Sequence, residues 1–278
     1  MIIDGNKIRD EIKEELKERV KLLKYPSLAI VWVGNDTVSA KYVEKKKKFG
    51  EDVGIKVDVY KYGEGILTDE LISEIKNIIK KNPTGIIVQL PLPKHIDSQR
   101  VLNIISINKD VDLLSEVAYK SFTDGISPIL PPVTGAIKEI LDRNKILGFM
   151  GLKAVIIGRG KLVGKPAALW LETMGARVSL LGRDTIDLSQ FTKTADIIIA
   201  GAGVPNLIKP DMLPEKFATK LGGVIIIDAA TSDVSGKIVG DVDPACVDKA
   251  LVFSPVPGGV GPITVAMLFK NLVTLAGK

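Results

Sequence analysis

The chain has 278 residues, enough for two domains at the usual ~100–200 residues per domain. Its 46% hydrophobic and 26% charged residues are ordinary for a globular protein and exclude disorder. No apolar stretch approaches the ~20 residues of a membrane helix. Residues 1–5 lack the basic and apolar regions of a secretory signal. We therefore expect a cytoplasmic protein with no membrane partner.

The counts of cysteine and histidine restrict the chemistry. The one cysteine, Cys246, excludes an intramolecular disulfide and a thiolate metal cluster. The one histidine, His95, excludes sites that need two or three imidazoles. A Ser-His-Asp triad would have to use His95, which we expect in a loop beside a strand end. We expect no metal site.

The net charge of +5 is a mild bias that suits anionic ligands. The densest basic segment is Lys41 with the lysine run 45–48, and only Tyr42 and Phe49 lie among these lysines. Aromatic residues make up only 5% of the chain, so a stacking platform for bases is poorly supported. We expect most of these lysines on a solvated helix face, and no nucleic acid as a partner.

The first third of the chain alternates apolar runs with amphipathic segments. Apolar residues spaced four apart predict a helix over residues 8–23. The following pattern predicts strands and helices over residues 27–33 (strand), 38–52 (helix), 55–60 (strand), 68–81 (helix, with Thr68 as N-cap) and 85–89 (strand). Strands separated by helices of this length indicate parallel β-α-β units.

The pattern loosens between about residues 109 and 132, and the prolines of segment 127–132 favour an extended chain. We place the domain boundary here, which gives a first domain of residues 1–118 and a second of residues 119–278. A helix over 134–144 follows as the connector.

The second domain again alternates strands with helices. The predicted elements are strands over 153–158, 176–181, 196–200 and 223–228, a helix over 163–174, and a last helix over 263–276. This order indicates an open parallel sheet. The fold class is therefore α/β, with two parallel-sheet α/β domains, the second a Rossmann-type dinucleotide-binding domain. We expect the last helix to pack back on the first domain.

Glycines 158, 160 and 164 follow the first strand of the second domain and open its helix. The spacing has one residue more than the GxGxxG fingerprint, yet the context favours an anion at the helix N-terminus. Taken alone, the loop fits an unliganded strand-to-helix turn equally well.

The end of the next strand, Gly182-Arg183-Asp184, favours a phosphorylated cofactor. Arg183 and Arg159 could hold a 2′-phosphate, whereas a carboxylate such as Asp184 suits the ribose hydroxyls of NAD. NADP is therefore the favoured cofactor, and NAD remains possible.

Several segments together resemble the bifunctional methylenetetrahydrofolate dehydrogenase/methenyltetrahydrofolate cyclohydrolase family. They run in family order and comprise Ile3-Asp4-Gly5, residues 33–46 with Ser39, Tyr42 and Lys46, QLPLP at 89–93, KDVD at 109–112, the glycine loop at 158–166, GDVD at 240–243 and PVPGGVGP at 255–262. The QLPLP and PVPGGVGP strings are far more specific than any glycine spacing.

The resemblance implies oxidation of 5,10-methylenetetrahydrofolate with NADP+ and hydrolysis of the methenyl product to 10-formyltetrahydrofolate. It implies tetrahydrofolate derivatives as small-molecule partners and a homodimer formed through the second domain. One alternative is a dehydrogenase-only member of the same fold. Another, from a different class, is a non-catalytic nucleotide- or RNA-binding protein.

Ser39, Tyr42 and Lys46 have the spacing of one helix face. By resemblance Tyr42 lies against the folate, with Ser39 also at the substrate, and Lys46 is the catalytic lysine. Lys45 and Lys47 are rotated ~100° to either side of Lys46, so we expect them to point away from Tyr42. Nearby cations should lower the pKa of Lys46.

By resemblance, Gln89 meets Lys46 and the substrate, and Asp112 recognises the pterin. Folate then lies beside Pro257, Gly258 and Gly259. The cofactor-binding candidates are Gly158, Arg159, Gly160, Val163, Gly164, Arg183 and Thr231.

The chain departs from the family pattern mainly on the cofactor side. Gly160 stands where the loop serine is usual, Gly182-Arg183 replaces a His-Ser pair, and residues 228–231 replace a glycine-containing turn. On the folate side, Leu113-Leu114 stands where Gly-Phe is usual. These departures leave the cofactor preference open.

Overall fold

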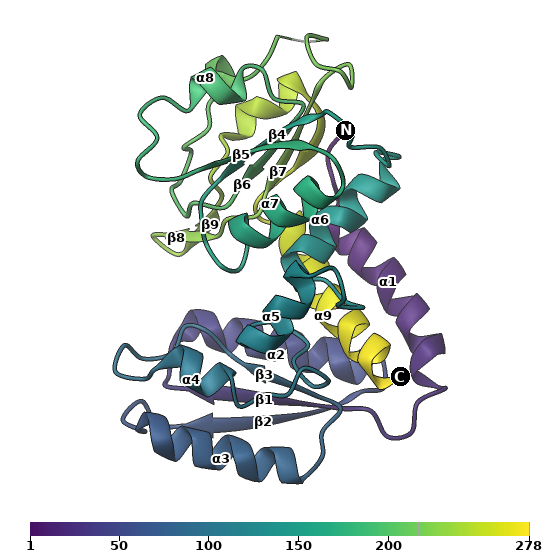
Figure 1. Ribbon diagram of the computed structural model, residues 1–278, viewed down its shortest axis with the longest axis vertical. Helices are drawn as coiled ribbons and strands as arrows, with labels where there is room; N and C mark the ends of the chain where they lie inside the picture. The colour runs from purple at the N-terminus through teal and green to yellow at the C-terminus, as the bar shows by residue number, and fades with distance from the viewer. Residues whose placement is uncertain (216, 278) are drawn as a thin grey trace. The chain divides into compact units, whose positions relative to one another are not determined.

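The computed structural model describes residues 1–215 and 217–277. Its α-helices, labelled in Figure 1, are α1 (Gly5–Val20), α2 (Thr37–Asp52), α3 (Thr68–Lys80), α4 (Ser98–Leu102), α5 (Glu116–Thr123), α6 (Pro132–Arg143), α7 (Gly164–Thr173), α8 (Ser189–Thr192) and α9 (Val260–Ala276). Its strands are β1 (Ser27–Val33), β2 (Lys56–Tyr62), β3 (Gly85–Val88), β4 (Lys153–Ile157), β5 (Arg177–Leu181), β6 (Ile197–Ala200), β7 (Val224–Asp228), β8 (Ser232–Val234), β9 (Lys237–Val239) and β10 (Ala250–Ser254). Short 3-10 helices cover Pro210–Met212 and Pro244–Lys249.

The chain divides into two compact units that are interleaved in sequence. Met1–Arg9 and Val133–Thr264 form the unit that we name the five-stranded unit. Asp10–Pro132 and Val265–Lys278 form the three-stranded unit. The division therefore falls inside both α1 and α9.

The division after Pro132 lies later in the chain than the boundary expected near residue 118. A boundary at residue 118 would cut α5, which local hydrogen bonds join to the preceding loop. The carboxylate of Asp110 accepts the N–H of Ser115 at 2.8 Å. The Ser115 side chain in turn accepts the N–H of Ala118 at the start of α5. These bonds tie α5 to the loop that follows β3.

The three-stranded unit contains a parallel sheet of order β2-β1-β3. Alternate residues of β1, including Ala29 and Val31, join buried side chains of α3 and α4 in one core cluster. On α2, Gly50 packs closely against α9, since a Cβ there would lie 2.9 Å from the ring of Phe269. The Phe49 and Phe269 rings pack with centroids 5.1 Å apart. Packing against both the sheet and α9 fixes α2.

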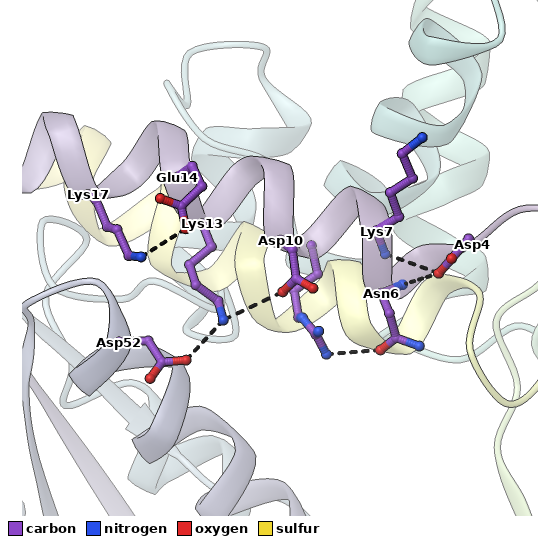
Figure 2. A network of polar contacts seen from close by, with 9 residues as sticks. Asp4, Asn6, Lys7, Asp10, Lys13, Glu14, Lys17 and Asp52 are labelled. Atoms are coloured by element: carbon purple, nitrogen blue, oxygen red, sulfur yellow. Dashed lines mark hydrogen bonds and ion pairs between the residues drawn. The ribbon is translucent and has the colours of Figure 1, made fainter.

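Charged side chains connect α1 to α2, as Figure 2 shows. The Asp4 carboxylate accepts the N–H groups of Asn6 and Lys7, each at 3.0 Å, and thereby caps the start of α1. Further along, Lys13 lies 2.9 Å from Asp52 in the last turn of α2. This contact lowers the pKa of Asp52 below its ordinary value, because the ammonium group stabilises the carboxylate.

The five-stranded unit contains a parallel sheet of order β10-β7-β6-β4-β5. Strand β4 pairs with β5 on one side and β6 on the other. The chain therefore adds β5 on one side of β4 and the later strands on the other side, so the strand order reverses at β4. In open α/β sheets, ligands bind at the carboxyl ends of the strands at such a point. The predicted fold class is confirmed.

Several elements were not predicted. The antiparallel pair β8-β9 and the short α4 carry few buried apolar residues, so periodicity gives little signal there. Thr68 does not act as an N-cap, because α3 begins at Thr68 itself and the cap position is Leu67. Among the described residues, no helix combines the length and apolar character needed to cross a bilayer.

Candidate active site

Lys46 on α2 and Gln89 at the end of β3 are in direct contact. The Lys46 Nζ donates a hydrogen bond of 3.0 Å to Gln89 Oε1. The Gln89 Nε2 donates to the Leu90 carbonyl at 2.7 Å, which directs the amide oxygen toward the lysine. The backbone N–H of Gln89 extends the sheet by bonding the Val31 carbonyl at 2.8 Å. The sheet therefore positions the acceptor of the lysine.

Lys46 and Asp112 influence each other's ionisation. Burial lowers the pKa of Lys46, and the negative charge of Asp112 opposes this shift. Burial raises the pKa of Asp112, Lys46 acts against that shift, and Asp110 adds to it. The lowered pKa of Lys46 was expected, but its cause is burial rather than neighbouring cations. A lysine and a carboxyl whose pKa values approach each other are suited to proton transfer.

Two residues that sequence reasoning missed hold the loop that carries Asp112. The carboxylate of Asp110 is buried and accepts the N–H groups of Leu114 and Ser115. The Nδ2 of Asn271, on α9, donates to the carbonyls of Val111 at 2.9 Å and Leu130 at 2.8 Å. Asn271 is 3% exposed and lies among buried apolar residues of α9 such as Leu268 and Leu272. A polar side chain at an apolar helical position is the signal that could have identified it.

The remaining substrate candidates of α2 lie near its start. Ser39 is buried, and its N–H donates to the carboxylate of Asp36 at 2.7 Å, which caps the helix. Tyr42 is half-buried, and the Lys45 Nζ lies 5.7 Å from the centre of its ring. The expectation that Lys45 points away from Tyr42 is therefore wrong, because residues three apart on a helix are neighbours. Lys47 instead lies 4.0 Å from Glu51.

The glycine loop between β4 and α7 is built by close backbone approaches. Gly158 has a φ of +109°, and a Cβ on Gly164 would collide with the Gly158 carbonyl. The N–H of Lys165 bonds the Gly160 carbonyl at 3.1 Å. The side chain of Val163 fills the space beside Gly201, which follows β6. The loop thus lies where the chain reverses across the sheet, with the N-terminus of α7 beside it.

The structure brings Arg159 and Asp184 together. The Arg159 Nη1 lies 2.7 Å from Asp184 Oδ1, and both side chains are exposed. Arg183, which precedes Asp184 in the chain, is also exposed. Thr231, the last cofactor candidate, is exposed in the segment that follows β7. The guanidinium of Arg159 thus lies at the end of β5, where it already has an acidic partner, and the role of both arginines at a 2′-phosphate stays a prediction.

The segment between β10 and α9 forms a tight loop. Gly258 has a φ of +100°, and its carbonyl accepts the N–H of Gly5 at 2.8 Å. A Cβ on Gly259 would collide with the buried hydroxyl of Ser254. Pro257 is exposed at the tip. Glycine at 258 allows the positive φ of the turn, and glycine at 259 leaves room for Ser254.

These features define a class of protein: an α/β protein with one dinucleotide-binding Rossmann unit and a second unit that holds a half-buried lysine beside an amide and a carboxyl group. Two family models match the chain. The catalytic domain of tetrahydrofolate dehydrogenase/cyclohydrolase matches residues 3–112, and the NAD(P)-binding domain of the same family matches residues 131–278. The chain belongs to the tetrahydrofolate dehydrogenase/cyclohydrolase family, so the resemblance drawn from the sequence is confirmed.

Individual relatives agree with this assignment. The chain is 41% identical to the bifunctional protein FolD of Nitratiruptor sp., over 99% of this chain and 97% of the relative. The crystal structure of the bifunctional enzyme FolD from Campylobacter jejuni is similar at a TM-score of 0.93 and 39% identity, covering 100% of this chain and 98% of that one. A Trypanosoma brucei methylenetetrahydrofolate dehydrogenase-cyclohydrolase, solved with NADP and an inhibitor, has a TM-score of 0.92 and 30% identity, covering 100% and 97%.

Proposed function

We propose that the protein oxidises 5,10-methylenetetrahydrofolate to 5,10-methenyltetrahydrofolate with NADP+ and hydrolyses this product to 10-formyltetrahydrofolate. The observation that carries the proposal is the cluster of Lys46, Gln89 and Asp112 in a chain that also holds a Rossmann unit. Full-length similarity to bifunctional FolD proteins supports both activities. The dehydrogenase-only alternative lacks that support.

The oxidation requires alignment rather than a base. The carbon that loses hydride lies between two nitrogens, whose lone pairs stabilise the resulting cation. Bound NADP+ supplies the hydride acceptor. The backbone of the glycine loop and the N-terminus of α7 fit a pyrophosphate, and Arg159 and Arg183 fit a 2′-phosphate. Tyr42 provides the face against which the folate rings lie.

The hydrolysis requires proton transfer, which Lys46 supplies. Water adds to the methenyl carbon and gives one proton to the neutral amine of Lys46, which releases it to solvent. The bond from this carbon to N5 then breaks, and the second water proton ends on N5, which leaves the formyl group on N10. Burial lowers the pKa of Lys46, which increases the share of neutral amine that can accept this proton. Gln89 keeps the amine oriented.

Asp112 recognises the pterin in this proposal. Its carboxylate can accept hydrogen bonds from the 2-amino group and the adjacent ring nitrogen. Pro257, Gly258 and Gly259 provide backbone against the flat ligand. The proposal further includes a cytoplasmic homodimer that forms through the second domain, with NAD as a possible second cofactor.

One assay tests the proposal. Purified protein is incubated with methylenetetrahydrofolate and either NADP+ or NAD+, and the reduced cofactor and the methenyl absorbance are followed separately. We expect reduced cofactor to form while methenyltetrahydrofolate stays low, because hydrolysis consumes it. Accumulation of methenyltetrahydrofolate in stoichiometric amount with reduced cofactor would leave only the dehydrogenase. Absence of any reduced cofactor would overturn the proposal.

A further inference from the structure

The Rossmann unit places an acidic and a basic side chain together at the end of β5. The guanidinium of Arg159, from the glycine loop, lies 2.7 Å from the carboxylate of Asp184. The Nε of Arg159 also donates to the Leu180 carbonyl at 3.4 Å. The guanidinium therefore lies across the end of the strand, with the carboxylate on its outer side.

Gly182 makes room for this pair. A Cβ at this position would lie 2.9 Å from both Arg159 Cζ and Asp184 Oδ1, closer than side-chain carbons approach such atoms. A side chain at this position would therefore require the ends of Arg159 and Asp184 to shift. Asp184 stays ionised in this arrangement, because its hydrogen bond from Arg159 lowers its pKa below the ordinary value.

Each of the two side chains suits a different nicotinamide cofactor. At the end of the second strand of a Rossmann unit, a carboxylate accepts hydrogen bonds from the ribose hydroxyls of NAD, whereas an arginine holds the 2′-phosphate of NADP. A 2′-phosphate that binds Arg159 must displace the Asp184 carboxylate. The negative charge of this carboxylate then stays close to the phosphate and repels it. A free 2′-hydroxyl requires neither change.

We propose that Asp184 is a specificity-determining residue that weakens binding of the 2′-phosphate by occupying Arg159, and so keeps cofactors without that phosphate usable. This inference rests on the proposed function of the Rossmann unit. The Asp184 carboxylate competes with the 2′-phosphate for the guanidinium group of Arg159. Both the ion pair and the charge of Asp184 lie at the exposed surface, where water screens such interactions. The expected effect of removing the carboxylate is therefore about three- to tenfold in the dissociation constant.

The test is the substitution Asp184→Asn with two probes, adenosine 2′,5′-bisphosphate and adenosine 5′-monophosphate, titrated by calorimetry. The dissociation constant of the bisphosphate should fall about three- to tenfold, while that of the monophosphate should stay equal or rise. Asp187→Asn is the matched control. It removes the same charge from the same loop, but Asp187 bonds Ser189 at 2.6 Å rather than an arginine. The control should leave the ratio of the two constants unchanged.

Two results would overturn the inference alone: an unchanged ratio in Asp184→Asn, or an equal change in Asp187→Asn, which would make the effect one of net charge. In both cases the nucleotides still bind, so the proposed function stands. If neither nucleotide binds to the unsubstituted protein, the assignment of the cofactor site fails as well.

Discussion

The Nζ atom of Lys46 lies 3.0 Å from the Oε1 atom of Gln89. The contact joins a helix to the end of a strand, and Gln89 cannot rotate away without breaking its bond to the Leu90 carbonyl. The amine is therefore oriented by the protein before any substrate arrives. Such orientation lowers the cost of positioning a proton carrier during the reaction.

Lys46→Met should nearly abolish the cyclohydrolase. Methionine retains the length of the stem but cannot carry a proton, and general acid–base contributions are typically ~10²–10⁴-fold. The dehydrogenase should lose less, because hydride transfer depends on alignment. The measurement is the rate of loss of methenyl absorbance beside the rate of cofactor reduction, and the variant should accumulate methenyltetrahydrofolate.

Lys47→Met is the control for this substitution, because Lys47 lies near Glu51. Lys45 is unsuitable as a control since it lies over the Tyr42 ring. If Lys47→Met loses hydrolysis as severely as Lys46→Met, or if Lys46→Met hydrolyses at close to the unsubstituted rate, Lys46 is not the proton carrier.

Asp112→Asn should weaken folate binding in both reactions and leave the dissociation constant of the cofactor unchanged. Asparagine places a donor against the donors of the pterin. The negative charge of Asp112 also raises the pKa of Lys46, so its loss should lower that pKa further. The fall in hydrolysis rate at acidic pH should then move to lower pH. Normal folate titration by this variant would contradict the assignment of Asp112.

Arg159→Ala and Arg183→Ala should each raise the Michaelis constant for NADP more than that for NAD. Loss of a charge-assisted contact typically costs ~1.5–3 kcal/mol, or roughly ten- to a hundredfold. The exposed position of both arginines places the effect toward the lower end of that range. Equal effects on the two cofactors would contradict a role for these arginines at the 2′-phosphate.

Asp228 should make the stability of the protein depend on pH. This carboxyl is 1% exposed at the end of β7, and burial raises its pKa from 3.8 to about 6. The folded state therefore binds the proton more tightly than the unfolded state. The resulting stability is fully present below pH 4 and is lost as the pH rises through 6. The total is about 3 kcal/mol at 1.36 kcal/mol per pKa unit.

Asp228→Asn isolates this dependence, since asparagine does not titrate. The Asp228 carboxylate accepts the N–H groups of Ala230 and Val242, and asparagine retains only one such acceptor. The variant should be less stable than the unsubstituted protein at pH 4. The difference in the free energy of unfolding, measured by urea at pH 4 and pH 7.5, should shrink at the higher pH. A difference that grows with pH would show that Asp228 titrates below its ordinary pKa.

The elements that the sequence predicted are those with strong periodicity. The buried strands and the amphipathic α3 fall within a few residues of their predicted bounds. Strand β10 was missed, although it is mostly buried and pairs with β7. It follows a short 3-10 helix directly, so no turn signal separates the two in the sequence.

The candidate site was predictable where one helix or one loop determines it. Spacing alone places Tyr42 and Lys46 on one face of α2. It could not show that Asp184 occupies Arg159, because that contact depends on the path of a side chain across the end of β5. It also could not show which carbonyl groups Asn271 contacts, because these lie far away in the sequence. Contacts between segments that are distant in the sequence produce no periodic pattern of apolar residues from which they could be predicted.

The interleaving of the two units has a consequence for biosynthesis. The first residues of the chain belong to the five-stranded unit, where the N–H of Ile3 bonds the Phe253 carbonyl at 2.8 Å. Ile3 is therefore synthesised long before Phe253, its hydrogen-bond partner. The core of the three-stranded unit is also completed late, since Phe269 and Asn271 belong to its second segment. Each unit can therefore complete its core only after its second segment has been synthesised, and until then the nascent chain exposes apolar surface.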